Sequence, residues 1–325
     1  MAFPKVSIVA TVKNEEDNIA ALLDSIANLD YSGEVETIVV DGGSTDRTAQ
    51  IVSKYSSVKL IIAHCNISEG RNIGISSSTG EIMAFIDGDC IAEPDWIKNI
   101  VRHFIEDSEI AIVGGPYIPL ENQGIVADYL AVYQGTYFPE TSGTTTYEHI
   151  AMGNAAIRKE IIKKVGGFDS GADHFEDEDI NFRSWKLGLK LFFADDVRVF
   201  HKYRTSLKDA SAVILRRSEA NFKFNQKHKR YWHILFPYTR SLILVSLAVL
   251  ILSLVFGNLT LFASEFVLLF LSFYFYSYRR LRKITHSPKM VLRTKLLLPV
   301  IDLYIRLLDS AGSIIWPFQK VFKPT

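Results

Sequence analysis

The chain has 325 residues, 48% of them hydrophobic, with 36 basic and 36 acidic side chains. This length suits one large domain with additions, or two domains, and excludes a disulfide miniprotein or a disordered tail. The two cysteines, Cys65 and Cys90, provide neither a disulfide framework nor zinc-ligand spacing. Residues 1–201 contain 31 acidic and 16 basic side chains, whereas residues 202–325 contain 5 and 20. This asymmetry predicts two environments for one chain, water and a membrane surface.

Apolar, β-branched runs alternate with helical patterns along residues 5–115. We expect strands at Val6–Val12, Thr37–Val40, Leu60–Ala63 and Ile82–Ile86, and helices at Asp17–Asn28, Thr45–Tyr55 and Ser68–Ser77. The alternation predicts an α/β fold with a doubly wound, mostly parallel sheet, which binds ligands at the carboxyl ends of its strands. No G-x-G-x-x-G follows the first strand and no P-loop motif occurs, which disfavours a dinucleotide dehydrogenase or a P-loop enzyme.

Two acidic motifs belong to the first part of the chain. Asp87-Gly88-Asp89 directly follows an expected strand, so its two carboxylates can share a divalent cation such as Mg²⁺; a solvated turn is the alternative. The run Glu176–Asp179 opens a helical pattern with four adjacent carboxylates, which repel one another unless a cation or a reaction needs them. One of them is therefore a candidate general base, with capping of the helix dipole as the alternative.

The second part of the chain contains a long apolar stretch. From Ser241 to Tyr278 there are 38 residues and one charge, Glu265, whereas one bilayer crossing needs about 20 residues. The turn dipeptide Gly257–Asn258 divides the stretch, so we expect a transmembrane helical hairpin over residues 237–278. Lys and Arg flank both ends and are absent from the turn, which predicts a multi-pass membrane protein with residues 1–203 in the cytoplasm. A buried soluble hairpin is the alternative.

The segments on either side of the hairpin have amphipathic patterns. We expect a basic interface helix in residues 204–236, and a basic linker followed by an amphipathic or membrane helix in residues 279–325. Asp302, Arg306 and Asp309 form one polar stripe on that last helix. Both segments suit the headgroup region of a membrane, although a third span with its stripe against other helices is the alternative. We therefore expect membrane lipids, and no nucleic acid, as partners of the basic residues.

Several motifs follow one another in a fixed order within residues 4–203. They are Val6–Glu16, Val39–Asp46, Gly70–Gly74 with Thr79–Glu81, Asp87–Asp89, Gly153–Arg158 with Gly166–Asp169, Glu176–Asp179 and Val197–His201. In this order they resemble the motifs of the family 2 glycosyltransferases. The resemblance implies a GT-A catalytic domain over residues 1–203 that transfers a sugar, with inversion, from a nucleotide-sugar donor. It also implies a divalent metal cofactor, Mn²⁺ or Mg²⁺.

The resemblance implies roles for individual residues. Those implied for nucleotide binding are Thr11, Lys13, Glu15, Asp41, Arg71 and Asp87. Asp89 is implied as the principal metal ligand and His201 as a further ligand, although a lone histidine is more often a packing or surface residue. Asp177 matches the general base, with Glu176 as the second choice. The residues implied at the sugar and the acceptor are Gly153 and Asn154.

Three positions depart from the family pattern. Thr11 stands where members usually have proline, Lys13 where they have tyrosine, and Gly42 where they have a second aspartate. The usual packing against the nucleotide base is therefore altered. Lys13 can instead reach a phosphate.

Several functional classes share these features. A processive polymer synthase needs a channel of many helices and a Q-x-x-R-W motif, which the chain lacks. A polyprenyl- or dolichyl-phosphate sugar synthase attacks with an ionised phosphate and needs no base, so the acidic run argues against it. We therefore expect hexosyl transfer to a hydroxyl of a lipid-linked glycan, as in N-glycan biosynthesis, with GDP-mannose as the first donor and UDP-sugars next. A catalytically inactive membrane scaffold is the more distant alternative.

Overall fold

The computed structural model describes residues 3–135, 141–172 and 174–230, six isolated positions between 255 and 274, and residues 297–306, 308 and 309. The chain divides into two compact units. The first consists of Met1–Gln123 and Tyr133–Tyr203, and the second of Gly124–Val132 and Arg204–Thr325. One division thus follows Tyr203, and the short segment Gly124–Val132 groups with the second unit.

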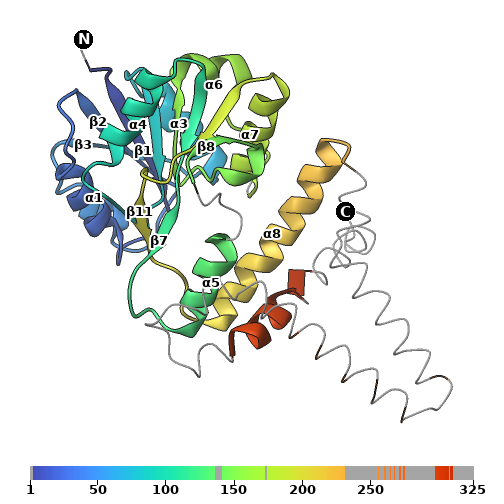
Figure 1. Ribbon diagram of the computed structural model, residues 1–325. Helices are drawn as coiled ribbons and strands as arrows, with labels where there is room; N and C mark the ends of the chain where they lie inside the picture. Colours follow the sequence, from blue (N-terminus) through green and yellow to red (C-terminus); the bar gives the residue numbers. More distant parts are fainter. Residues whose placement is uncertain are drawn as a thin grey trace, which may run out of the picture. The chain divides into compact units, whose positions relative to one another are not determined.

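The first unit contains an eight-stranded sheet in the order β3-β2-β1-β4-β9-β6-β10-β8. Strands β3, β2, β1 and β8 are labelled in Figure 1. Its strands are β1 (Val6–Val12), β2 (Val35–Asp41), β3 (Val58–Ile62), β4 (Ile82–Ile86), β6 (Ile110–Gly114), β8 (Gly143–Thr145), β9 (Asn154–Arg158) and β10 (Lys190–Phe193). Strands β1 to β4 pair in parallel, as do β6 and β10, while β9 and β8 run antiparallel to their neighbours. The predicted α/β fold with a mostly parallel sheet is confirmed.

A second sheet has three short strands, β5 (Cys90–Ala92), β7 (Tyr117–Pro119) and β11 (Val199–His201). They lie in the order β5-β11-β7, with β11 antiparallel to β5 and parallel to β7. The register places His201 opposite Cys90. This small sheet therefore brings the end of the first unit next to the residues that follow β4.

Helices connect the strands of the large sheet. They are α1 (Ile19–Ala27), α2 (Thr48–Val52), α3 (Ile67–Ser76), α4 (Trp96–Glu106), the 3-10 helix η1 (Tyr147–His149), α6 (Lys159–Val165) and α7 (Glu176–Lys186). In α4, Trp96, Ile100 and Phe104 recur every four residues and are buried, as expected for a helix with one apolar face. All five residues of β4 are buried, as expected for a central strand with both faces covered.

The expected elements of residues 5–115 are present, and their limits differ by a few residues. The second helix is the largest difference, because it begins at Thr48 instead of Thr45. Asp46 accepts hydrogen bonds from the amide and the hydroxyl of Thr48, at 2.9 and 2.6 Å. These bonds stabilise a turn before the helix, so Thr45 remains in the preceding loop.

The second unit contains α8 (Leu207–Lys227), most of α5 (Ile125–Gly135) and a helical segment over residues 297–306. Asp302 is fully buried, and its carboxylate accepts hydrogen bonds from Tyr129 Oη of α5 and from Arg306 Nε, each at 2.9 Å. Ser218 of α8 donates a hydrogen bond to Asp309. The stripe of Asp302, Arg306 and Asp309 therefore packs against other helices.

The apolar residues of the segment 297–306 lie partly on its outer side. Leu297, Val300 and Tyr304 are 39%, 42% and 43% exposed. The expectation that the stripe would face the headgroup region is therefore corrected: a buried carboxylate needs hydrogen-bond donors, and α5 supplies one of them. The exposed residues instead include apolar side chains at helical spacing.

The expected transmembrane hairpin over residues 237–278 falls outside the described residues, apart from the six isolated positions. Within the part of the chain that the structure describes, no helix combines the length and the apolar character needed to cross a membrane. The hairpin thus remains a prediction from sequence.

Glu36 of β2 accepts hydrogen bonds at the amino-terminal edge of the large sheet. Its donors are the hydroxyl of Ser7, the amide and hydroxyl of Thr79, and the amide of Gly80. Burial raises the pKa of Glu36, but these bonds outweigh burial and lower it from 4.5 to about 2. The ionised carboxylate therefore joins β1, β2 and the turn before β4.

We predict that Glu36→Gln destabilises the first unit in a pH-dependent way. The contribution of the carboxylate is fully present above its unfolded pKa of 4.5 and is lost as the pH falls toward 2. After allowance for solvent exposure we expect a difference of about 1–2 kcal/mol at neutral pH, shrinking below about pH 4. Urea unfolding of both proteins across this range measures it. A pH-independent difference would contradict the prediction.

Candidate active site

The carboxyl ends of β1, β2 and β4 lie at one edge of the large sheet because these strands are parallel. Lys13 follows β1, Asp41 ends β2 and Asp87 follows β4. Val12 and Asp41 are paired in the register. The expected nucleotide-binding residues therefore lie at the edge where open α/β sheets bind ligands.

The loops after β1 and β2 are joined by reciprocal hydrogen bonds. The amide of Asn14 donates to Ser44 Oγ at 2.9 Å, and the amide of Thr45 donates to Asn14 Oδ1 at 2.8 Å. The amide of Glu15 donates to Thr48 Oγ1 at 2.8 Å. Asn14 has φ of 57°, a left-handed conformation that asparagine tolerates. The two loops therefore hold each other in place.

The nucleotide-binding candidates of these loops differ in accessibility. Asp41 is 1% exposed and its Oδ1 accepts from the amide of Ser44 at 2.7 Å. Thr11 has a buried hydroxyl that meets no partner among the described residues. Lys13 is exposed, and Glu15 is half-buried and accepts from Asn18 Nδ2 at 2.6 Å. Of these candidates, Lys13 is the one whose side chain is open to solvent.

Asp89 and His201 provide a pair of metal-ligand atoms. Asp89 Oδ1 and His201 Nε2 are 3.4 Å apart, and with Cys90 Sγ they form a group whose atoms all lie within 4.8 Å. A carboxylate oxygen and an imidazole nitrogen suit Mn²⁺, whereas the buried thiol of Cys90 is a soft ligand that suits other metals. The donor set of Asp89 and His201 therefore fits the divalent ion implied by the resemblance.

Aromatic rings hold the imidazole of His201. The ring centroids of Tyr117 and Tyr203 lie 5.0 and 4.4 Å from that of His201, both edge-on. His201 Nδ1 is buried and has no hydrogen-bond partner within the described residues. The orientation of the imidazole is therefore set by packing and by the β5–β11 pairing.

Asp87 lies between the metal-ligand pair and a buried arginine. Burial raises the pKa of Asp87, and so do Asp89 and Asp177, whereas Arg71 and His201 favour its ionised form. A Cβ atom at Gly153 would come within 1.9 Å of Asp87 Oδ2, so a glycine is required there for the carboxylate to fit. The backbone of Gly153 therefore lies directly beside the Asp87 carboxylate.

The four carboxylates of residues 176–179 have different surroundings in the first turn of α7. Glu176 is buried and accepts from Arg71 Nη1 at 2.6 Å, while Asp179 is buried and accepts from Arg183 Nε at 2.8 Å. Burial raises the pKa of Glu176 to about 7, against the influence of Arg71. Asp177 is half-buried and accepts from the amide of Glu178 at 2.9 Å. Glu176 and Asp179 each pair with an arginine.

Asn154 occupies a structural position at the start of β9. Its side chain is fully buried and accepts from Trp96 Nε1 at 2.8 Å. Its Nδ2 donates to the carbonyls of Pro116 and Val197, both at 2.9 Å. The expectation that Asn154 contacts the sugar or the acceptor is therefore not supported, because protein groups take up its amide.

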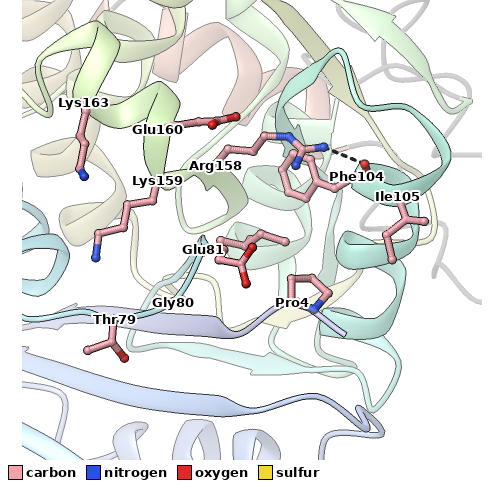
Figure 2. A pocket seen from close by; sticks show the side chains of 11 residues that line it. Pro4, Thr79, Gly80, Glu81, Phe104, Ile105, Arg158, Lys159, Glu160 and Lys163 are labelled. Carbon is pink, nitrogen blue, oxygen red and sulfur yellow. Dashed lines mark hydrogen bonds between the residues drawn. The ribbon is translucent and has the colours of Figure 1, made fainter. Parts of the chain in front are cut away.

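A separate cavity of about 390 Å³ lies at the opposite edge of the large sheet, where β1 and β4 begin (Figure 2). Arg158 donates to the carbonyls of Phe104 and Ile110, at 2.7 and 3.0 Å, and its guanidinium lies 4.7 Å from the Phe104 ring centroid. Lys159 donates to the carbonyl of Ser78 at 2.7 Å. The two cationic side chains thus bind carbonyl groups of the protein. None of the site residues expected from the sequence lines this cavity.

Comparison with known proteins bears on the edge that carries Asp41, Asp87 and Asp89. Residues 7–166 match the family model Glycosyl transferase family 2. This match spans 160 of the 325 residues, and together with the relatives described next it identifies the protein as a glycosyltransferase. Asp41, Asp87 and Asp89 lie within the matched residues, whereas His201 and the acidic turn of α7 follow them in the chain.

The glycosyltransferase domain is similar to curated proteins over about three fifths of the chain. Glycosyltransferase AglE of Haloferax volcanii is 29% identical over 209 residues, which cover 62% of this chain and 68% of that protein. The Glucosyl-dolichyl phosphate glucuronosyltransferase of the same organism is 23% identical, covering 61% and 66%. Other relatives are covered less, such as the pre-mycofactocin glycosyltransferase of Mycobacterium tuberculosis at 44% of its length.

A solved structure shares the fold of the chain. The mannosyltransferase PcManGT from Pyrobaculum calidifontis, in complex with GDP-Man and Mn²⁺, aligns with a TM-score of 0.65 over 98% of this chain and 88% of that one. The sequences are 17% identical. This likeness supports the GT-A arrangement of the glycosyltransferase domain.

We predict that Asp89→Ala removes metal-dependent binding of nucleoside diphosphate. Loss of one carboxylate leaves His201 Nε2 as the remaining ligand of the pair, so affinity in Mn²⁺ should fall by about 10- to 100-fold or more. Isothermal titration with GDP and UDP, with and without Mn²⁺, measures this change. Asp95→Ala, at an exposed aspartate of the same unit, is the control and should bind normally. Equal binding by both variants would contradict the metal assignment.

Proposed function

We propose that the protein is an inverting, metal-dependent hexosyltransferase. It moves a sugar from a nucleotide-sugar donor to a hydroxyl of a lipid-linked glycan at the cytoplasmic face of a membrane. The observation that carries the proposal is the convergence of three elements at one edge of the sheet. Asp89 and His201 lie 3.4 Å apart, and Arg71 contacts both the strand-end Asp87 and Glu176 of the acidic first turn of α7.

On the donor side, Asp89 and His201 would hold the divalent ion. When bound, this ion would neutralise the negative charge that develops on the leaving diphosphate. Thr11 at the end of β1 and Glu15 would line the proposed nucleoside pocket, and Asp41, which is 1% exposed, would have to become accessible to contact the base. Lys13, whose side chain is exposed, would contact a phosphate. These side chains bind and orient the donor at the carboxyl edge of the sheet.

On the acceptor side, Asp177 is the proposed general base. Inversion requires a base on the face of the sugar opposite the leaving group, where it takes the proton of the attacking hydroxyl. Glu176 and Asp179 are buried and each accepts from an arginine, and Asp177 lies between them in the first turn and is half-buried. A carboxylate within about 2.6–3.2 Å of the hydroxyl can accept its proton directly.

GDP-mannose is the first donor to test, followed by UDP-sugars. A carboxylate such as Asp41 accepts a hydrogen bond from uracil and guanine alike. PcManGT binds GDP-Man with Mn²⁺, and the TarS structures of S. aureus contain UDP or UDP-GlcNAc. These structural neighbours support a nucleotide sugar as the donor class.

A lipid-linked acceptor fits the second part of the chain. The apolar stretch around residues 237–278 and its flanking Lys and Arg residues favour a membrane location with the catalytic domain in the cytoplasm. Leu207 and Leu215 of α8 and Leu297, Val300 and Tyr304 add exposed apolar side chains to the second unit. The name of one relative, Glucosyl-dolichyl phosphate glucuronosyltransferase, describes a lipid-linked acceptor for that protein.

A polyprenyl-phosphate sugar synthase is the alternative enzyme. Its acceptor is an ionised phosphate that needs no base, so the two alternatives differ in what they require of Asp177. An inactive scaffold is the more distant alternative, and it would not need the Asp89–His201 pair. Both alternatives can be separated from the proposed function by the variant described next.

We predict that Asp177→Asn lowers sugar transfer by about 10²- to 10⁴-fold, because the amide is nearly isosteric but cannot take the proton. The donor is the nucleotide sugar that gives the largest thermal shift in a panel of GDP- and UDP-sugars with Mn²⁺. Release of nucleoside diphosphate, with and without glycolipid acceptors, reports turnover, and donor affinity should stay within a few-fold. Activity close to wild type would favour the phosphate-acceptor alternative, and absence of donor binding would favour the scaffold.

We predict that the full chain behaves as an integral membrane protein. A hairpin with two apolar helices should remain in the membrane fraction after both a high-salt wash and alkaline carbonate. Release by high salt alone would contradict the hairpin, because it would show attachment through the basic residues. The measurement is fractionation followed by immunoblotting of the full-length protein.

A further inference from the structure

Arg71 of α3 carries a buried charge that contacts three separate parts of the first unit. Its side chain is 5% exposed, and its Nη1 donates to Glu176 Oε1 at 2.6 Å. Its Nη2 lies 3.5 Å from Asp87 Oδ1. The guanidinium also lies over the ring of Phe168, 5.3 Å from its centroid. Arg71 thus joins the end of β4, the loop before α7 and the first residue of α7.

Other side chains at the start and along one face of α3 bind the same loop through its main chain. The hydrogen bonds run from Asn66 Nδ2 to the carbonyl of Ser170 at 2.8 Å, from Ser68 Oγ to that of Ala172 at 2.6 Å, and both ways between Asn72 and the backbone of Phe168 at 2.8 and 3.0 Å. α3 therefore serves as a support for the loop that leads into α7. Among these contacts between α3 and the residues from 168 to 176, the Arg71–Glu176 pair is the one next to Asp177 in the chain.

The geometry disfavours the two roles implied by the resemblance for this pair. Nη1 and Nη2 of Arg71 face Glu176 and Asp87, and the side chains of Arg71 and Glu176 are only 5% and 8% exposed, so little of the guanidinium is open to a bound nucleotide. Glu176 is equally ill placed to act as a base. Its carboxylate is directed at Arg71, whereas a base must reach the hydroxyl of a bound acceptor.

We propose that Arg71 is a positioning residue, which anchors the first turn of α7 through Glu176 and thereby holds Asp177 at the site of transfer. Glu176 is the anchor point and Asp177 acts on the acceptor. The inference rests on the proposed function, because it concerns the residue that takes the proton. It assigns Arg71 to catalytic geometry and leaves donor binding to other residues.

The experiment compares Arg71→Met, Arg71→Lys and Glu176→Gln in the full-length protein. Arg71→Met should lower kcat for nucleoside-diphosphate release by about 10²-fold, the scale of a displaced base, while KM for the donor stays within about 3-fold. Arg71→Lys should lie between it and wild type, since an ammonium retains the charge but lacks the planar fork. Glu176→Gln can still accept from Arg71 but loses the charge of the pair, so kcat should fall by about 10-fold, less than in Arg71→Met.

Hydrogen exchange gives a readout that does not depend on activity. The amide of Asp179 donates to the carbonyl of Phe175 in the first turn of α7. We expect the amides of this turn to exchange faster in Arg71→Met than in wild type. Arg158→Met is the matched control, because Arg158 also stacks on a phenylalanine and donates to backbone carbonyls, at the opposite edge of the sheet. It should lower the melting temperature while kcat and the exchange at α7 stay unchanged.

Two results would overturn the inference. Loss of nucleoside-diphosphate affinity in Arg71→Met, with unchanged exchange at α7, would make Arg71 a nucleotide contact. A loss of about 10²-fold in kcat for Glu176→Gln, with donor binding intact, would make Glu176 the base. If Arg71→Met does not fold, Arg71→Lys and Glu176→Gln provide the same comparison. If the wild type neither binds nor cleaves any nucleotide sugar, the proposed function fails, and the exchange measurement alone still decides whether Arg71 anchors α7.

Discussion

Carboxylates collected at one edge of a sheet repel one another, and in this protein the buried guanidinium of Arg71 allows several of them to stand close together. Glu176 is in direct contact with it, Asp87 lies 3.5 Å away, and Asp177 lies within its field. Removing one partner of such a buried pair typically costs about 3–5 kcal/mol, because the other charge is left uncompensated. The acidic turn of α7 can therefore approach the end of β4 only where this arginine is present.

The surrounding loops depend on a different kind of constraint. The segments after β1 and β2 contain little regular structure, yet Ser44 Oγ accepts from the amide of Asn14, and Asn14 Oδ1 accepts from the amide of Thr45. Asn72 does the same for Phe168 on the other side of the site. Such bonds leave few backbone groups without partners, which favours a rigid arrangement before any ligand arrives. The acceptor side and the donor side of the site are thus both held by side chains that do not themselves need to touch substrate.

The sequence predicted most of the fold and the location of the site, because alternating strands and helices place Asp41 and Asp87 at strand ends by topology alone. It could not show that Glu176 pairs with Arg71 across 105 residues, since no local pattern records which charges meet. The approach of His201 to Asp89 depends on β5 and β11, two three-residue strands too short to leave a periodic signal. The motif around Asn154 suggested a contact with the sugar or the acceptor. No local sequence pattern indicates that this side chain is buried and accepts from Trp96 Nε1.

The interleaved course of the chain has a practical consequence for dissecting the protein. α5 belongs by sequence to the catalytic part, yet its fully buried Tyr129 is satisfied by Asp302, from the far end of the chain. Cutting the polypeptide after Tyr203 would remove that acceptor and leave a phenolic hydroxyl and its apolar neighbours uncovered. A soluble fragment made in this way is expected to be prone to aggregation, and its low activity would say little about the enzyme. Permuted or co-expressed halves that keep α5 together with residues 297–306 are the sounder route.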